Sequence, residues 1–395
     1  MRADQHVEME RLGPQAEPPT VMSVDAMQQE LIDRVRQASA SRTALCITCG
    51  GSKAFYGRAC AGETLDVSSH RGIVAYEPTE LVITARAGTP LAEIEAVLAA
   101  NNQMLPFEPP HFSGKATLGG MAATGLSGPR RPWGGSVRDA VLGVKLLNGR
   151  GEVLRLGGQV MKNVAGYDVS RLMVGALGTL GVLLEVSVKV LPRPACERTL
   201  VFDDVGRKSR QAPSAEWASH LPAEGAIKPL FRPTNTTNTT PQMPISASLE
   251  LDGRSYLRLS ASSRCVEMAA DSLGGETADP AIWTAVRDQT LPFFQTDLPL
   301  WRISLPPAAP ALNLLGNELI EWTGAQRWLA SELPAKTIRQ RVGALGGHAT
   351  LFRNHAAADS VFQPLAPAML ALQQRIKQAL DPHAIFNPGR LYPEL

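Results

Sequence analysis

Three glycine-rich segments stand out as places where the chain could approach an anionic or flat ligand closely. The first is the run CGGSK at residues 49–53, which directly follows the strand-like residues 44–48. Glycine has no side chain and tolerates positive φ, so its backbone N–H groups can converge on an anion such as pyrophosphate. A two-glycine turn alone is weak evidence, and neither G-x-G-x-x-G nor the Walker pattern is present. A Rossmann-type dinucleotide site is therefore disfavoured.

Two further segments combine glycine with small apolar residues. Residues 116–125, ATLGGMAATG, contain no charged side chain. This composition favours close contact with a bulky planar ligand over the alternative of a flexible surface loop. Residues 174–182, VGALGTLGV, place three glycines directly before a long strand-like run. They predict the same kind of contact.

The spacing of apolar residues along the chain predicts an α+β fold. Helices are expected at residues 27–35, 90–100, 280–289, 325–333 and 366–380. Strands are expected at residues 44–48, 72–76, 81–87, 142–147, 152–156, 181–191, 246–251, 255–260 and 300–305. The residues NGRG at 148–151 predict a hairpin turn, because the glycines permit positive φ.

The chain length and the changes in local composition predict two folded domains. A chain of 395 residues exceeds one ordinary core. Residues 1–22 are polar and lack periodicity, which predicts a disordered leader. Prolines 192 and 194 end the long strand, so we place the first domain at 23–195 and the second at 196–375, with a C-terminal tail at 376–395.

Charge and composition exclude several classes of protein. The formal net charge of +2 is too balanced for a nucleic-acid-binding surface. No apolar run approaches the ~20 residues of a transmembrane helix, and the N-terminus lacks a signal-peptide core, so the cytoplasm is expected. Five cysteines, an odd number, favour free thiols over disulfides. Cys46-x-x-Cys49 has no second pair to complete a metal or redox site, so we interpret it as structural and expect no metal.

A resemblance to a known family becomes specific when the motifs are taken in order. The runs CGGSKAFYG, ATLGGMAATG, KNVAGYD, GALGTLGVLLEVSVKVLP and FNPGR together resemble the FAD-binding domain of the vanillyl-alcohol-oxidase superfamily. Three more runs, GPRRPWGGSVRD, LWRISLP and GGHATLFR, resemble the E-subunit family of bacterial glycolate oxidases. The resemblance covers the chain from residue 30 onward except for residues 204–242, where the Thr/Asn-rich segment 234–241 has no assigned role.

The resemblance implies a PCMH-type FAD-binding domain of two subdomains, an α+β cap domain and a tail that returns to the FAD domain. It assigns the FAD pyrophosphate to Gly50, Gly51, Ser52 and Lys53. It assigns the diphosphate and flavin to Thr117, Gly119, Gly120 and Thr124, the approach to the flavin from the long strand to Gly178, Thr179 and Val182, and the isoalloxazine end to Asn387. No histidine lies in the Gly50 loop, so we expect non-covalent FAD.

One departure concerns catalysis. Relatives that oxidise 2-hydroxy acids directly share a C-terminal set of histidines and a glutamate, which is absent here. Arg302 and His348 are the candidate catalytic residues, for the substrate carboxylate and for proton abstraction. Arg302 alternates with Trp301 and Ile303, so it projects from the opposite face of its strand, toward the flavin. A solvated or ion-paired arginine and an ordinary loop histidine are the alternatives.

The resemblance also implies a function and partners. The chain is expected to be the FAD-binding subunit of a complex that oxidises glycolate, a small 2-hydroxy acid, to glyoxylate. Its partners would be a D-type flavin subunit and an iron–sulfur F-type subunit, which could hold the complex peripherally at the inner membrane. One alternative is a structural flavin-binding subunit with the chemistry confined to the D subunit. Another is a free-standing FAD-dependent 2-hydroxy-acid oxidase.

Overall fold

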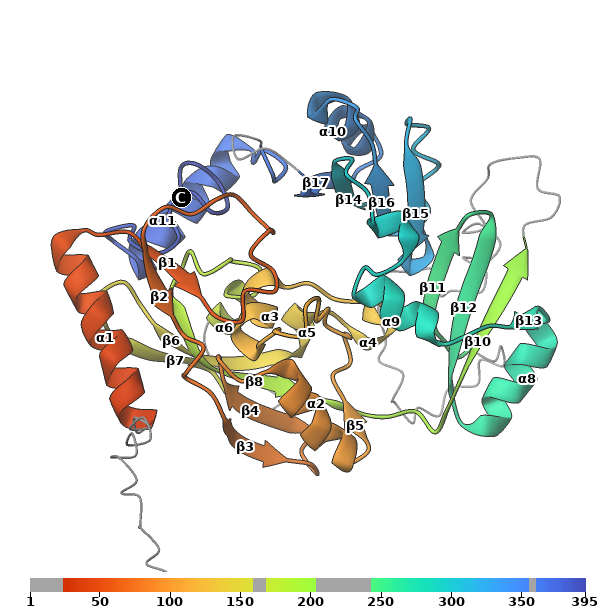
Figure 1. Cartoon of the computed structure of the whole chain (residues 1–395), viewed down its shortest axis with the longest axis horizontal. Coiled ribbons are helices and arrows are strands. Elements are labelled where there is room, and N and C mark those ends of the chain that lie inside the picture. The colour runs from red at the N-terminus through yellow and green to blue at the C-terminus, as the bar shows by residue number, and fades with distance from the viewer. Residues whose placement is uncertain (1–23, 159–167, 204–242, 355–359) are drawn as a thin grey trace, which may run out of the picture.

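The structure is a computed structural model that describes residues 24–158, 168–203, 243–354 and 360–395. The expected leader at 1–22, most of the KNVAGYD run and the segment 234–241 lie outside these residues. Two α+β units lie side by side, an N-terminal unit and a second unit that we call the cap, and each builds its own sheet (Figure 1). Along the described ranges, no helix has the length and hydropathy needed to cross a bilayer. The predicted α+β class is confirmed.

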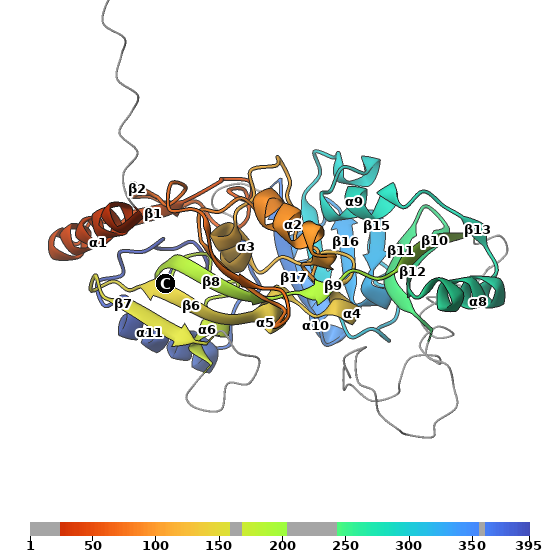
Figure 2. The ribbon, with the colours of Figure 1, turned by 90° about the horizontal axis from the view of Figure 1, so that it is seen from below.

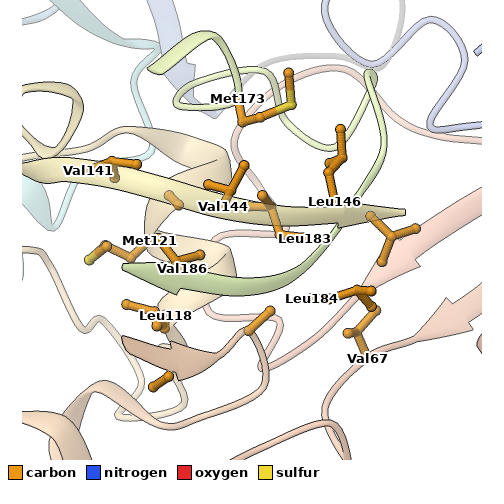
Figure 3. Close-up of a cluster of buried hydrophobic side chains, with 14 of the residues drawn as sticks. Val67, Leu118, Met121, Val141, Val144, Leu146, Met173, Leu183, Leu184 and Val186 are labelled. Atoms are coloured by element: carbon orange, nitrogen blue, oxygen red, sulfur yellow. The ribbon is translucent and has the colours of Figure 1, made fainter. Parts of the chain in front are cut away.

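The N-terminal unit is built on a five-stranded antiparallel sheet in the order β3-β4-β8-β6-β7. Its strands are β3 (Ile73–Glu77), β4 (Val82–Arg86), β6 (Val141–Leu147), β7 (Val153–Gly157) and β8 (Val182–Lys189). The helices of this unit are α1 (Val24–Ser41), α2 (Leu91–Ala100), α3 (Leu118–Thr124), α4 (Arg131–Gly134), α5 (Val137–Ala140) and α6 (Val169–Leu172). Leu118 and Met121 of α3 pack against the central strand β8, as Figure 3 shows. Burying β8 on both faces gives this unit its core.

A smaller sheet lies beside this core. Strand β1 (Leu45–Thr48) pairs in parallel with β2 (Glu63–Asp66), and the short strands β5 (Gln103–Met104) and β9 (Leu191–Pro192) form a separate antiparallel pair. Leu45 also forms a parallel bridge with Phe386 from the C-terminus. The tail therefore adds to the edge of β1, nearly 200 residues away from β8 in the sequence.

The second unit is an eight-stranded antiparallel sheet in the order β13-β10-β12-β11-β15-β16-β14-β17. Its strands are β10 (Cys196–Asp203), β11 (Ile245–Leu251), β12 (Arg254–Ala261), β13 (Glu276–Thr277), β14 (Leu300–Ser304), β15 (Asn317–Glu321), β16 (Gln326–Ala330) and β17 (His348–Arg353). Helices α8 (Ser263–Leu273), α9 (Ala281–Arg287) and α10 (Ala335–Ala344) complete it. The sheet begins at Cys196, directly after the two prolines that end the first unit's long strand region.

Two sequence-based expectations about secondary structure were wrong. Residues 325–333 were expected to be helical, but β16 occupies 326–330 in the middle of the sheet with every residue buried. A strand buried on both faces carries no alternation that would distinguish it from a buried helix. Residues 118–124, expected only as a glycine-rich stretch, form helix α3 with Thr117 as N-cap.

The last helix, α11 (Pro367–Leu380), lies with the N-terminal unit in both views (Figures 1 and 2). Lys377 is buried there, and its ammonium donates hydrogen bonds to the carbonyl oxygens of Thr179 and Phe386 and to the Asp381 carboxylate. The same carboxylate accepts from the backbone N–H groups of Ile385 and Phe386. This paired charge fixes the direction in which the tail leaves the helix.

Candidate cofactor site

A cavity of about 310 Å³ opens in the N-terminal unit, between β1, the start of α3 and the C-terminal tail. Its walls consist largely of backbone and small side chains. They include every residue expected to hold the cofactor except Thr179 and Val182, namely Gly50, Gly51, Ser52, Lys53, Thr117, Gly119, Gly120, Thr124, Gly178 and Asn387. Four segments that are far apart in the sequence therefore meet around one space.

The glycines of this wall allow backbone segments to come unusually close. A Cβ atom at Gly50 would lie 1.7 Å from the Lys115 carbonyl oxygen, and one at Gly119 would lie 2.7 Å from the Cβ of Ala87. Gly51 differs, because it has φ +68° and open space in front of its Cα. Gly50 and Gly119 thus allow the wall to close, whereas Gly51 leaves room for a ligand against its backbone.

Lys53 supplies positive charge at the cavity. Its side chain is 7% exposed, and its Nζ lies 5.5 Å from the centre of the Phe112 ring and 3.3 Å from the Ser52 hydroxyl. Burial lowers the pKa of this ammonium to about 8, although the Asp288 charge acts in the opposite direction. A buried ammonium that lacks a close carboxylate is stabilised when an anion binds beside it, as a diphosphate would.

The hydroxyl groups of Thr117 and Thr124, at the two ends of α3, already form hydrogen bonds within the protein. The Thr117 hydroxyl accepts from the Gly120 N–H at 3.3 Å and donates to the Cys49 sulfur at 3.3 Å. The Thr124 hydroxyl donates to the Gly120 carbonyl at 2.8 Å. Both residues line the cavity, so they help to shape its wall.

Asn387 connects the tail to two walls of the cavity. Its side-chain oxygen accepts from the Ile47 N–H at 2.7 Å, and its amide donates to the Leu177 carbonyl at 2.6 Å. Its backbone N–H donates to the Leu45 carbonyl. Because both ends of the amide are used within the protein, Asn387 positions β1 and the Gly178 turn around the cavity.

Thr179 and Val182 lie behind the wall. The Thr179 hydroxyl donates to the Ala176 carbonyl at 2.7 Å, and Val182 is fully buried in the sheet core. These two residues therefore support the Gly178 turn from behind and do not face the cavity.

Arg302 projects from the face of β14 opposite to Trp301 and Ile303. Its Nε donates to the Gln326 side chain at 2.8 Å, and its positive charge opposes the rise that burial causes in the pKa of Tyr56. With Glu321 it lines a separate cavity of only about 20 Å³, room for roughly one water molecule. Arg302 thus faces the N-terminal unit, but it does not line the larger cavity.

His348 begins the edge strand β17 and is exposed. Partial burial of the imidazole ring is the larger cause that lowers the pKa of His348, and the nearby positive charge of Arg302 lowers it further. Aromatic rings of Phe55, Tyr56 and Phe352 pack edge to face or tilted beneath this part of the cap, at centroid distances of 5.1–5.3 Å. Neither candidate catalytic residue therefore faces the glycine-lined cavity.

Arg130 is buried within the chain. Its guanidinium pairs with Glu108 and Glu197, and Arg258 of the cap pairs with the same Glu108 at 2.8 Å. The two arginines lower the pKa of Glu108 against the opposing effect of its burial. This ion-pair cluster joins the two units and leaves Arg130 no free face.

The expectation of free cysteines was wrong for two of the five. Cys46 and Cys60 form a disulfide, with 6.1 Å between their Cα atoms, and both line the cavity. The spacing of 14 residues matches no local motif, so composition alone could not reveal the pair. In the described ranges, no three His, Cys, Asp or Glu side chains gather as a metal site would require.

Sequence reasoning also missed Arg390 as part of the site. Its guanidinium donates to the carbonyl oxygens of Ala54, Tyr56 and Arg58, so it clamps the segment after the glycine loop to the tail. The signal was present, since Arg390 ends the FNPGR run. The carbonyl groups that accept its hydrogen bonds could be identified only from the structure.

The fold and the cavity define an FAD-binding flavoprotein of the PCMH type. A family described as FAD binding domain matches residues 25–157. In fold, the chain is similar to a solved structure of alkyldihydroxyacetonephosphate synthase, with a TM-score of 0.60 and 14% identity, covering 91% of this chain and 75% of that one.

Comparison of sequences narrows the assignment. The chain is 49% identical to glycolate oxidase subunit GlcE of Escherichia coli over 367 residues, which are 93% of this chain and 98% of the relative. It is 32% identical to glycolate oxidase subunit GlcD of Bacillus subtilis over 154 residues, which are 39% of this chain and 32% of that protein. The chain belongs to the glycolate oxidase subunit GlcE family.

Proposed function

We propose that this chain holds one FAD non-covalently in the glycine-lined cavity and acts as the E-type subunit of a complex that oxidises glycolate to glyoxylate. The observation that carries the proposal is the cavity itself, where the open backbone at Gly51 lies near the buried Lys53 ammonium. Extensive identity to glycolate oxidase subunit GlcE supports the choice of complex. The partners would be a D-type flavin subunit and an iron–sulfur F-type subunit.

Different residues of the cavity would contact different parts of the cofactor. Gly51 and Ser52 would receive the pyrophosphate at the backbone, and Lys53 would neutralise part of its charge. Thr117 and Gly120 would contact the adjoining part of the ligand, while Asn387 keeps the opposite wall in place. Bound FAD supplies the capacity to accept two electrons and to pass them on singly.

We further propose that this subunit relays electrons and does not itself oxidise glycolate. Arg302 lines the separate cavity of about 20 Å³ and not the glycine-lined one, so its guanidinium does not reach a substrate carboxylate beside a flavin there. His348 is exposed at a sheet edge, away from the cavity. A second candidate, a structural flavin-binding subunit, rests on the same two observations, with the chemistry confined to the D-type subunit. The complex would work in the cytoplasm, peripherally at the inner membrane.

An anaerobic experiment tests the relay. The purified chain is mixed with glycolate and its flavin spectrum is recorded, first alone and then assembled with the D-type and F-type subunits. We expect the chain alone to stay oxidised and the assembled flavins to bleach. Bleaching of the isolated chain would contradict the relay.

A variant complex distinguishes the relay from the structural candidate. Gly51→Glu in this chain should prevent its FAD from binding while the other subunits keep their cofactors. If the chain relays electrons, glycolate should still reduce the D-type flavin, but transfer to the terminal acceptor should stop. Unchanged electron flow through an assembled complex that lacks this FAD would favour the structural role.

A further inference from the structure

The Cys46–Cys60 disulfide encloses the glycine loop of the cofactor cavity. Cys46 lies in β1, and Cys60 follows 14 residues later. The residues between them include the whole CGGSK run at 49–53. Because both half-cystines line the cavity, the bond closes the phosphate-side loop at its two ends.

The disulfide belongs to the same set of contacts that positions the tail. The Cys60 sulfur lies 3.8 Å from the Asn387 side-chain oxygen, the oxygen that accepts from the Ile47 N–H. The Arg390 guanidinium holds carbonyl oxygens between residues 54 and 58. Opening the disulfide therefore removes the one covalent restraint on a loop that is otherwise held by hydrogen bonds from the tail.

The third cysteine of the cavity does not compete for this pair. Cys49 is a free thiol that lines the cavity, and the Thr117 hydroxyl donates to its sulfur. Burial raises the pKa of this thiol. A protonated thiol is a poor nucleophile, so exchange within the cavity is disfavoured and opening the pair requires a reductant from outside.

We propose that Cys46 and Cys60 form a reversible thiol–disulfide site that is coupled to FAD binding, with a dithiol as its reductant. One thiolate of the dithiol attacks a sulfur of the pair and forms a mixed disulfide, and the second thiol then displaces it. Two electrons and two protons pass to the chain, which gains two thiols, while the dithiol becomes a disulfide. In a reducing compartment, protein disulfides are usually catalytic or redox-sensing.

The coupling follows from shared space. A reductant reaches the pair through the cavity, and FAD in that cavity would shield it. Conversely, the closed disulfide orders the loop before FAD arrives, so less conformational entropy is lost on binding. Coupling between two equilibria is reciprocal. The factor by which bound FAD disfavours reduction of the disulfide must therefore equal the factor by which the disulfide raises the affinity for FAD.

Thiol counting on the full-length chain, purified without reductant, tests whether the pair exists. Denatured and alkylated, the chain should yield three labelled cysteines before treatment with dithiothreitol and five after it, with Cys46 and Cys60 as the new sites. When the folded protein is treated with dithiothreitol, Cys46 and Cys60 should become labelled more slowly in the holoprotein than in the FAD-free chain. Five labelled cysteines before treatment would overturn the proposal, as would equal rates for the two forms.

FAD affinity tests the coupling. Flavin fluorescence titration of the reduced chain should show a dissociation constant raised by about tenfold, within the usual range for coupled sites. Cys60→Ser should show the raised value with or without dithiothreitol. Cys265→Ser, which removes an exposed free thiol of α8 in the cap, should respond like the unaltered chain. Equal affinity of the oxidised and reduced chains, with circular dichroism unchanged, would overturn the proposal.

Discussion

The two cavities at the centre of this molecule are built in opposite ways. The larger one has walls of backbone and small side chains, and the loop bearing Gly51 faces open space. The smaller one, beneath the cap, is lined by side chains that bind one another, with Arg302 on Gln326 and Glu321 accepting from Gln326 and Trp328. The open backbone at Gly51 leaves room for a ligand in the larger cavity, whereas hydrogen-bonded side chains fill most of the smaller one.

The two cavities also differ in the charged residues that line or adjoin them. Lys53 at the larger cavity is a buried cation that forms no ion pair with a carboxylate of the described residues, and burial lowers its pKa to about 8 although the Asp288 charge opposes this. Glu321 at the smaller cavity has a pKa raised by burial, and two side-chain donors and the Arg302 charge partly offset the effect. The first arrangement favours arrival of an anion, and the second already contains its compensating groups.

The largest expected effect comes from Gly51→Glu. A carboxylate placed beside the pyrophosphate should weaken FAD binding on the order of 1000-fold, because two unit charges about 4 Å apart near a protein surface interact by ~4 kcal/mol. Gly253→Glu is the matched control, since Gly253 has φ +73° and equally open space, but lies in a cap turn. Flavin content after gel filtration measures both. Equal retention in the two variants would mean that the phosphates lie elsewhere.

The second effect concerns the tail. Deleting residues 384–395 removes Phe386, Asn387 and Arg390, so FAD retention should fall on the order of 100-fold, far more than after trimming an ordinary terminus. Asn387→Ala should account for about tenfold of this through its two lost hydrogen bonds.

Asn354→Ala is the control for the tail. Asn354 also has positive φ and donates two side-chain hydrogen bonds to carbonyl groups, but it belongs to the cap. Full flavin content in folded Asn387→Ala would show that the tail does not shape the cavity. Circular dichroism establishes that each variant is folded.

A smaller effect should depend on pH. With a pKa of about 8 in the free protein, Lys53 is charged below that pH, and a bound diphosphate would raise its pKa further. Above pH 8 binding therefore has to take up a proton, and FAD affinity should fall by about fivefold in all between pH 8 and pH 10. Lys53→Gln should weaken binding about fivefold at pH 7 and remove this dependence.

The exposed Lys336 of α10 provides the control, because Lys336→Gln should keep the pH dependence of the unaltered chain. Fluorescence titrations from pH 6 to pH 10 cover the window. A Lys53→Gln profile that overlays the unaltered one would assign the titration to another group.

The smallest effect is expected at the second cavity. Arg302→Met should change FAD affinity by less than about twofold, because the guanidinium lies outside the cofactor cavity. It should lower the midpoint of thermal unfolding, since Gln326 loses a hydrogen-bond partner. If Arg302→Met released the flavin without unfolding the chain, the two cavities would not be separate in function.

The sequence predicted most of the backbone and the position of the cavity, for a physical reason. Alternation marked β8 and spacing marked α11, while glycine runs marked the places where a side chain would clash, as at Gly50 and Gly119. Strand β16 was taken for a helix because burial on both faces removes the alternation that identifies a strand.

Pairings between distant side chains could not be predicted from the sequence. The disulfide of Cys46 with Cys60 and the hydrogen bond from Lys377 to the Thr179 carbonyl depend on how distant segments meet around β1, which no local pattern encodes. Arg302 was placed on the correct face of its strand. Its hydrogen-bond partner Gln326 comes from another strand, β16, and could be identified only from the structure.

The most direct test of the account is the flavin released from the purified chain by acid. The chain is saturated with FAD, passed through a gel-filtration column and precipitated with acid, and the flavin in the supernatant is quantified against the protein. We expect one FAD per chain in the supernatant and a colourless pellet. Yellow colour retained in the washed pellet would show a covalent bond, and a folded chain that holds no FAD would contradict the cavity as a cofactor site.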